Sequence, residues 1–351
     1  MKVLYLTKYS RNGASSRLRS YQYFPFLEAK GYAVTVRPFF DEDYLVDLYA
    51  GKKTDKLKLI RSYLNRFFTL FSVYKYDKLV IEKELFPYFF SWFEKILALL
   101  KVNYIVDYDD AIFHNYDLSA SKLIRFLLKN KIDNVMKYSG CVLAGNGYLY
   151  ERAKVAGAKI IIILPTVIDV DAYKVTQKTA ATKVIIGWIG SPSTFKYVKN
   201  YKMVFSEILQ NKAVELHIVG ATEDIGLGTN VKYLKWNEES EVDAISKFDI
   251  GIMPLENTSW ELGKCAYKII QYMGCGLPVV ASAVGMNIEV VDEGVNGFLV
   301  QEEEEWLDKL RLLIEDSALR ERLGKSGRKK VESQFSLQKS STIILSVLSN
   351  E

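Results

Sequence analysis

The chain alternates between short apolar runs and longer stretches in which apolar residues recur every three or four positions. Short runs rich in Val, Ile and Tyr are typical of buried strands, and the longer pattern is typical of amphipathic helices. In the first half we expect strands at residues 2–7, 32–40, 76–82, 102–108, 139–145 and 159–168. The helices expected between them lie at about residues 17–30, 56–72, 87–100, 121–138 and 147–156.

The alternation pauses at residues 169–182, which are mostly small or polar and predict a linker, and then a second series begins. Its expected strands lie at residues 184–190, 214–220, 231–235, 249–254, 278–282 and 297–300. Its expected helices lie at residues 195–210, 239–247, 265–274, 302–315 and 317–331, with a last amphipathic helix at 337–349. Such alternation favours parallel sheets covered on both faces, so the sequence predicts an α/β protein of two consecutive domains.

Composition excludes several classes of protein. Hydrophobic residues make up 49% and charged residues 25% of the 351 positions, which is ordinary globular usage and excludes disorder. Three cysteines without C-x-x-C spacing exclude a zinc ribbon, a thioredoxin-like site and a disulfide scaffold, and two histidines are too few for a His-rich metal site. We find neither a signal peptide nor an apolar run of about 20 residues, which predicts a cytoplasmic protein.

Charge is unevenly divided along the chain. Residues 1–180 contain 28 Lys and Arg and 18 Asp and Glu, a net charge of +10, whereas residues 181–351 contain 19 and 24, a net charge of −5. The expected helices at 56–72, 87–100 and 121–138 combine aromatic and basic residues, a composition that suits an anionic membrane surface. The alternative is that the aromatic residues pack in the core and the lysines are solvated. Nucleic acid is a less suitable partner because no recognised binding module is present.

The most informative segment is Gly263 to Val280, GKCAYKIIQYMGCGLPVV, in which a loop rich in Gly and Lys precedes a helix. A helix N-terminus presents unpaired backbone N–H groups and the positive end of the helix dipole. Lys264 and Lys268 add two ammonium groups, so the segment predicts an anion site that suits a diphosphate. Gln271, one turn deeper, can hydrogen-bond a ribose hydroxyl. The alternative is an ordinary surface helix with solvated lysines.

This segment, together with NIEVVDEGVNGFLV at residues 287–300, resembles the C-terminal half of the retaining GT-B glycosyltransferases of the "group 1" family. Lys268, Tyr272, Met273 and Gly276 match a common form of that family's donor-binding segment. The segments at residues 14–36, 164–173, 186–198 and 249–264 resemble further parts of the family in the right order, so the resemblance covers most of the chain.

The resemblance implies a GT-B fold, in which two Rossmann-like domains face each other across a cleft. The acceptor domain is expected at residues 1–168, the linker at 169–182 and the donor domain at 183–335. A C-terminal helix within residues 336–351 is expected to pack back on the first domain.

Loops after strands hold the residues that the resemblance assigns to the donor, because ligands of open parallel sheets lie beyond the carboxyl ends of the strands. These residues are Gly13, Gly190, Ser191, Trp236, Glu256, Lys264, Cys265, Ala266, Tyr267 and Gln271. Lys196 and Lys268 are assigned to the donor phosphates, where a cation stabilises the charge of the leaving group without a bound metal. For Lys196 the alternative is an exposed helix lysine, and for Trp236 it is a place in the core.

Two departures from the family pattern concern its paired glutamates. The positions of the two carboxylates, eight residues apart, are occupied by Gly263 and Gln271. Gln271 keeps the capacity for a ribose hydrogen bond, whereas Gly263 leaves the sugar contact to Glu256 or Glu261 in the preceding loop. The identity of the donor sugar is therefore not implied.

In the first half, Asp107, Asp109, Asp110 and Ala111 fit a D-x-D-D-A pattern at the end of an expected strand. Asp109 or Asp110 is expected to orient the acceptor hydroxyl or take up its proton, and caps of the following loop are the alternative. Acceptor contacts are also assigned to three other residues, Arg17, Glu84 and His114.

The function predicted is transfer of a sugar from a nucleotide-diphosphate donor to a glycan or lipid-linked acceptor, with retention of configuration and without a metal or other cofactor. Surface polysaccharide or lipopolysaccharide biosynthesis is the expected role. A nucleotide-sugar epimerase or hydrolase, or a non-catalytic interaction subunit, are the alternatives that the altered glutamate positions leave open.

Overall fold

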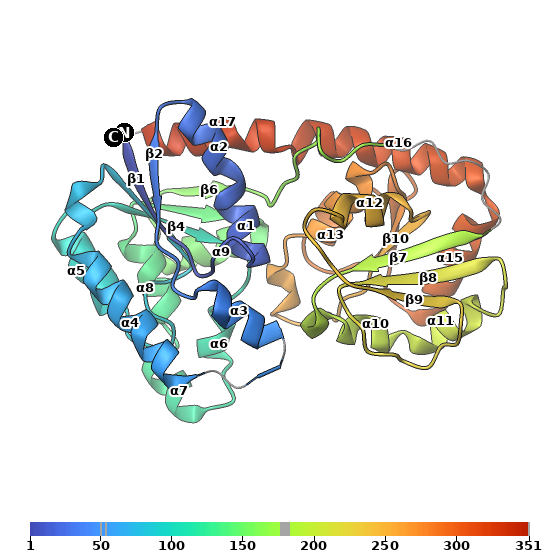
Figure 1. The fold of residues 1–351 in the computed structure, drawn as a ribbon, viewed down its shortest axis with the longest axis horizontal. Coiled ribbons are helices and arrows are strands. Elements are labelled where there is room, and N and C mark those ends of the chain that lie inside the picture. The colour runs from blue at the N-terminus through green and yellow to red at the C-terminus, as the bar shows by residue number, and fades with distance from the viewer. Residues whose placement is uncertain (50, 53–54, 176–182, 350–351) are drawn as a thin grey trace. The chain divides into compact units, whose positions relative to one another are not determined.

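Two six-stranded parallel sheets organise the computed structural model, which describes residues 1–49, 51–52, 55–175 and 183–349 (Figure 1). Each sheet belongs to one of two compact units. Unit 1 consists of residues 1–166, 262–265 and 340–351, and unit 2 consists of residues 167–261 and 266–339. The predicted linker at 169–182 falls partly outside the described residues, and its described residues belong to unit 2.

The sheet of unit 1 has the order β2-β1-β3-β4-β5-β6. Its strands are β1 (Lys2–Leu6), β2 (Ala33–Val36), β3 (Lys78–Glu82), β4 (Tyr104–Tyr108), β5 (Cys141–Ala144) and β6 (Ile161–Ile163). The helices of this unit are α1 (Ala14–Arg19), α2 (Phe24–Ala29), α3 (Glu42–Tyr49), α4 (Lys56–Leu70), α5 (Trp92–Leu99), α6 (His114–Asp117), α7 (Lys122–Leu128), α8 (Lys131–Tyr138) and α9 (Gly147–Ala156).

The sheet of unit 2 has the order β12-β11-β10-β7-β8-β9. Its strands are β7 (Val184–Ile189), β8 (Val214–Val219), β9 (Val231–Leu234), β10 (Ile250–Met253), β11 (Val279–Ser282) and β12 (Gly297–Val300). The helices are α10 (Lys196–Asn200), α11 (Lys202–Ile208), α12 (Glu241–Ser246), α13 (Tyr267–Gly274), α14 (Asn287–Val290), α15 (Glu303–Glu315) and α16 (Ser317–Gln334). The last helix, α17 (Leu337–Ser349), begins in unit 2, and its residues from Ser340 onward belong to unit 1.

Both sheets reverse their winding direction once. In unit 1 the chain runs from β1 to β2 on one side and then crosses to β3 on the other, and in unit 2 it crosses in the same way from β9 to β10 beside β7. At such a switch point the loops leaving two neighbouring strands part in opposite directions and leave room for a ligand. The topology therefore points to the carboxyl ends of β1 and β3 and of β7 and β10.

The expected strands are all present, and the largest errors concern helices. The expected helix at 17–30 is two helices, because a 3-10 turn at Tyr21–Tyr23 precedes α2, which has Pro25 in its first turn. The expected helices at 121–138 and 195–210 are likewise each divided in two, and the short helices α3, α6 and α14 were not expected. No helix among the described residues is both long enough and apolar enough to cross a bilayer.

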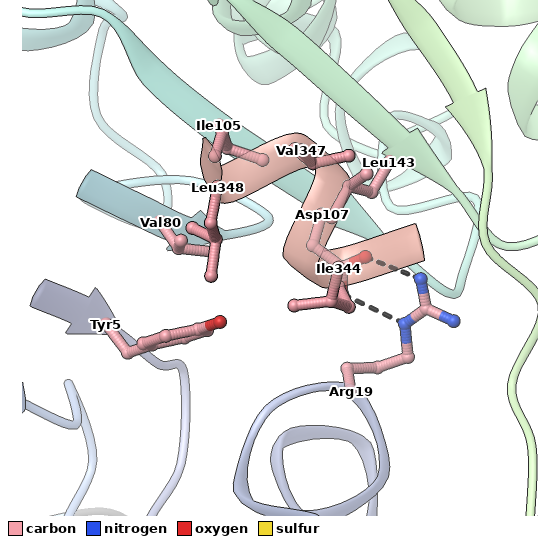
Figure 2. A pocket seen from close by; sticks show the side chains of 9 residues that line it. All are labelled: Tyr5, Arg19, Val80, Ile105, Asp107, Leu143, Ile344, Val347 and Leu348. Atoms are coloured by element: carbon pink, nitrogen blue, oxygen red, sulfur yellow. Dashed lines mark hydrogen bonds and ion pairs between the residues drawn. The ribbon is translucent and has the colours of Figure 1, made fainter. Parts of the chain in front are cut away.

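The residues of α17 from Ser340 onward cover part of the unit 1 sheet. Ile344, Val347 and Leu348 line a small cavity whose other walls include Tyr5 of β1 and Asp107 of β4 (Figure 2). Arg19 reaches the same cavity from α1, and its guanidinium makes two hydrogen bonds to Asp107, at 2.9 and 2.5 Å. Burial beneath the apolar helix face raises the pKa of Asp107, and the Arg19 guanidinium opposes that effect as its cationic partner.

The core of unit 2 is anchored on Trp188 of β7 and Trp306 of α15, which are almost completely buried. The N-terminus of α15 carries a run of acidic residues, and Glu302 and Glu305 form a capping box there. Next to α15, α16 packs so closely on the turn after α13 that a Cβ atom at Gly324 would overlap the carbonyl oxygen of Gly276. Only glycine permits this approach.

Gly324→Ala should therefore destabilise unit 2 by about 2 kcal/mol, because a rigid backbone carbonyl has to move to admit the methyl group. Urea unfolding followed by tryptophan fluorescence measures this well, since four of the five tryptophans lie in unit 2. Ser326→Ala, at a partly exposed position of the same helix, is the matched control and should change the free energy of unfolding by less than about 0.5 kcal/mol. Equal effects of the two substitutions would contradict the packing argument.

Candidate functional site

A buried cluster of charges lies at the carboxyl ends of β1, β3 and β4, the switch point of unit 1. Lys83 directly follows β3, and its ammonium group lies 2.8 Å from Asp109 Oδ1 and 3.6 Å from Asp110 Oδ2. Ser15, in α1, donates hydrogen bonds to Asp109 at 2.6 Å and to Glu82 at 3.1 Å. The D-x-D-D-A residues are thus held by partners from three other segments of the chain.

Lys83 is held in a left-handed backbone conformation, with φ of +67°. Non-glycine residues adopt this conformation rarely and at an energetic cost, and such strain concentrates at functional sites. The conformation accompanies burial of the lysine between the carboxylates, where only 4% of its side chain is exposed. The hydroxyls of Ser15 and Ser16 both bind Glu82, so neither serine caps α1, whose N-cap is Gly13.

These contacts fix the protonation of Asp109. Burial by itself raises the pKa of this carboxyl, but Lys83 and Arg19, with the Ser15 hydroxyl, outweigh it and hold the pKa well below its usual range. Lys83 shows the reciprocal effect: burial lowers its pKa, and the attraction of Asp109 and Asp110 raises it above the usual value. Asp109 is therefore a charged and weakly basic group, suited to orienting a donor more than to taking up a proton.

The segment 262–265 completes this cluster within unit 1. Lys264 Nζ lies 3.0 Å from Asp110 Oδ1, and the Cys265 thiol donates to the carbonyl oxygen of Asp109 at 3.1 Å. Burial raises the pKa of Cys265 to about 12, so the thiol stays neutral. A Cβ atom at Gly263 would lie 2.5 Å from the backbone nitrogen of Ala111, which explains why no glutamate stands at this position.

The residues assigned to the acceptor are not gathered in one place. Glu84 is buried and accepts hydrogen bonds from Tyr116 and from Lys131, so both of its oxygens already have partners. His114 bonds to Asp117 and to the Tyr148 hydroxyl, and Arg17 is buried in α1. Lys131, which lies in the expected basic helix at 121–138, is buried inside the unit with Glu84.

In unit 2, the switch point is occupied by the end of β7, the end of β10 and the start of α13. The Tyr272 hydroxyl, on α13, accepts from the Ile189 amide at 3.0 Å and donates to the Ile252 carbonyl at 3.3 Å. The helix is thereby tied to both strands. Its N-cap, Ala266, has a left-handed φ of +48°, and Tyr267 begins the helix.

Gly190, the first residue after β7, lies against the first turn of α13. A Cβ atom there would come within 2.5 Å of the Trp188 ring and within 2.9 Å of Lys268 Cε. The ammonium group of Lys268 lies 5.7 Å from the centre of the Trp188 ring, a cation–π distance. The structure thus brings together Gly190, Lys268 and the α13 N-terminus, as the sequence predicted for the donor loop. Ser191 follows Gly190 and bonds to Ser193.

Other assigned residues of unit 2 form two side-chain networks. Lys196 lies 3.6 Å from Glu256, which also accepts from Asn200. Glu261, our second candidate for the sugar contact, is buried and bonded to Tyr197 and Thr258, so Glu256 is the more exposed carboxylate of this loop.

The second network surrounds Gln271, whose amide nitrogen donates to Tyr173 at 2.8 Å and to Glu241 at 2.7 Å. Trp236 Nε1 donates to the other oxygen of Glu241 at 2.6 Å, and the indole stays partly exposed. Trp236 and Gln271, assigned separately from the sequence, are therefore neighbours joined by one carboxylate.

Sequence reasoning did not assign Lys83, Ser15, Tyr173 or Glu241. Lys83 carried a weak signal, because it lies between two glutamates directly after a strand, but a charged strand end is usually solvated. Glu241 and Tyr173 gave no signal in the sequence, since their hydrogen bonds with Gln271 depend on the tertiary fold. Among the residues that the structure describes, no group of three or more His, Cys, Asp or Glu is placed to hold a metal ion.

Comparison with known proteins gives a family model that matches part of the chain and a fold that matches all of it. Residues 183–316 match the family model described as glycosyl transferases group 1. Spore coat protein SA of Bacillus subtilis is 26% identical over 203 residues, covering 56% of this chain and 46% of its own length, so the chain matches about half of that protein.

Solved structures match along the entire chain. HepE of Anabaena, solved with UDP-glucose, has a TM-score of 0.73 at 16% identity and 99% coverage of both chains. WaaG, a glycosyltransferase involved in lipopolysaccharide biosynthesis, has a TM-score of 0.71 at 14% identity and full coverage of both chains. The expected GT-B fold of two α/β domains is confirmed.

Lys83→Met should destabilise unit 1 by about 3 kcal/mol at pH 7, because it leaves Asp109 buried without its cation. Adding Asp109→Asn should recover part of this loss, and urea unfolding followed by circular dichroism measures both variants. Additive effects of the two substitutions would show that the residues are not coupled.

Since the pKa of Asp109 is lowered on folding, the stability that Asp109 contributes is present above its ordinary pKa of 3.8 and is lost as the pH falls below that value.

Proposed function

We propose that the chain, whose residues 183–316 match the glycosyl transferases group 1, moves a sugar from a nucleotide-diphosphate donor to a glycan or lipid-linked acceptor. The donor binds unit 2 and the acceptor hydroxyl binds unit 1. The observation that carries the donor assignment is the approach of Gly190 to Lys268 at the N-terminus of α13. Backbone N–H groups and one ammonium group converge there at a switch point, as a diphosphate requires.

The chemistry proposed is departure of the nucleoside diphosphate with attack on the same face of the sugar, so that configuration is retained. The bond between the anomeric carbon and the phosphate oxygen breaks, and a bond to the acceptor oxygen forms. The acceptor proton passes to the leaving diphosphate, whose new charge Lys268 and the α13 dipole stabilise. The cations of the chain thus stabilise the charge of the leaving group, and the reaction needs no metal ion.

Neighbouring contacts define how the rest of the donor is held. Both amide hydrogens of Gln271 are donated to Tyr173 and Glu241, so a ribose hydroxyl binds the remaining amide oxygen as a donor. Lys196 reaches a phosphate by exchanging its contact with Glu256, which is then available to the sugar hydroxyls. Trp236, partly exposed beside Glu241, offers a ring face to the base.

On the acceptor side, Asp110 is the better of the two carboxylates for orienting a hydroxyl. Its side chain is 24% exposed, against 13% for Asp109, and it accepts from Lys264 at one oxygen. Asp109, held ionised by Lys83, fixes the position of Asp110 through the shared lysine. We propose that the reaction takes place in the cytoplasm, and the three free, buried cysteines suit a reducing compartment.

Synthesis of a surface polysaccharide or lipopolysaccharide is the role we propose, on the basis of the structural likeness to WaaG. Product analysis separates transfer from the alternatives left open by the altered glutamate positions. Incubation with the donor and a glycan acceptor should give a longer glycan and a free nucleoside diphosphate. Release of sugar alone would indicate a hydrolase, a changed sugar epimer an epimerase, and no turnover with intact binding a non-catalytic subunit.

Lys268→Ala should weaken the binding of UDP at least tenfold and change the binding of uridine much less, because the lysine contacts only the phosphates. Isothermal titration with UDP, GDP and dTDP, each paired with its nucleoside, measures both effects and identifies the base. Lys325→Ala, at an exposed lysine of α16, is the matched control and should bind all ligands as the wild type does. Equal losses for nucleotide and nucleoside, or no binding of any nucleotide, would overturn the donor assignment.

A further inference from the structure

Three helical segments of unit 1 expose large apolar side chains. Along α4, Leu57, Ile60, Leu64 and Phe68 recur every three or four residues and are all exposed, up to 77% at Leu57. This spacing places them on one stripe of the helix, and the opposite stripe, with Arg66, faces the interior. One stripe of α4 therefore packs inside the unit, and the opposite, exposed stripe is also apolar. An exposed apolar stripe of this kind indicates a surface that binds a partner.

Exposed apolar side chains also occur on α5 and α7. Trp92, Ile96 and Leu99 form a similar exposed stripe on α5, and Phe126, on α7, is 80% exposed. Packing between Phe67 and Phe93 joins α4 to the beginning of α5, and the two helices lie beside each other in Figure 1. Hereafter the apolar face means the exposed residues Leu57, Ile60, Leu64, Phe68, Trp92, Ile96, Leu99 and Phe126.

The charges on these segments are of one sign. Residues 56–71, 87–101 and 121–129 contain a single acidic residue, Glu94, which is completely buried. The exposed cations around the apolar face are Lys56, Arg61, Lys95, Lys101, Lys122 and Lys129. The nearest acidic residues are Asp55, at the N-cap of α4, and Asp43 and Asp47, which pair with Lys58. Apolar residues with a mainly basic border match a surface that is apolar beneath an anionic layer. A second copy of this chain would instead place like charges against each other.

A cavity of about 240 Å³ opens between α5 and the α7–α8 turn, at the edge of the apolar face. Phe90 and Trp92, stacked with ring centres 4.5 Å apart, line it together with Lys95, Asn130 and Asn134. One exposed ammonium group and two amides suit a phosphate, and the stacked rings suit the boundary between headgroups and acyl chains.

We infer that unit 1 docks on an anionic lipid bilayer through the apolar face, with a lipid phosphate in the cavity beside Lys95. The apolar residues enter the boundary between headgroups and acyl chains, and the surrounding cations bind the anionic headgroups. Docking adds a membrane partner to the proposed transfer reaction and does not depend on which nucleotide the donor carries.

Flotation of the full chain with vesicles tests this inference. The wild type should float with phosphatidylcholine–phosphatidylglycerol vesicles at low salt, and at least tenfold less with pure phosphatidylcholine or in 1 M NaCl, because salt screens the headgroup attraction. Phe68→Ser/Phe126→Ser and, separately, Lys95→Glu/Lys122→Glu should each reduce flotation at least tenfold. Met203→Ser/Ile288→Ser, which removes two exposed apolar residues of unit 2, is the matched control and should float as the wild type does.

Three results would overturn the inference. The first is no flotation of the wild type with either vesicle, and the second is unchanged flotation of the apolar variant. The third is a concentration-dependent dimer that Phe68→Ser/Phe126→Ser abolishes, which would identify the apolar face as a contact between two copies. Nucleotide binding, titrated in the same variants, should stay at the wild-type level, so a failure of docking is distinguishable from a failure of the donor site.

Discussion

The buried ammonium group of Lys83 is the charge on which the carboxyl edge of the unit 1 sheet depends. It lies among Glu82, Asp109 and Asp110, and without it three carboxylates from neighbouring strand ends would repel one another away from bulk water. Its backbone is strained, which indicates that the surrounding structure holds it in place. Because Asp109 neutralises Lys83, Asp110 retains the more exposed side chain and the freedom to meet a hydroxyl.

In unit 2 the electrostatic requirement is positive potential at one place in a unit whose net charge is negative. Residues 181–351 carry a net charge of −5, so the diphosphate binding that we propose for unit 2 requires positive potential to be produced locally. The fold supplies it by anchoring α13 to β7 and β10 through Tyr272 and by bringing the backbone of Gly190 against Lys268. A few donors placed at a switch point outweigh the average charge of the unit, because electrostatic interactions fall off with distance and are screened by salt.

The excess positive charge of the first half has two locations in the structure. Some cations are internal: Lys83, Arg19 and Lys131 each neutralise a buried carboxylate. Six others, Lys56, Arg61, Lys95, Lys101, Lys122 and Lys129, are exposed in the three helical segments of the apolar face, whose single acidic residue is buried. Different lysines and arginines therefore stabilise the fold and border the proposed membrane-binding face. The net charge alone does not distinguish these two groups of cations.

The sequence by itself determined the strands and the order of the two α/β units, because hydrophobic periodicity and turn residues are local properties of the chain. It also predicted the helix that contains Lys268, whose residues are close together in sequence. Only the tertiary structure decided that Lys83 pairs with Asp109, that Glu84 pairs with Lys131, and that Gln271 donates a hydrogen bond to Glu241. These partners are 26, 47 and 30 residues apart, and which charges meet across such separations is set by strand order and helix packing. No local pattern encodes that choice.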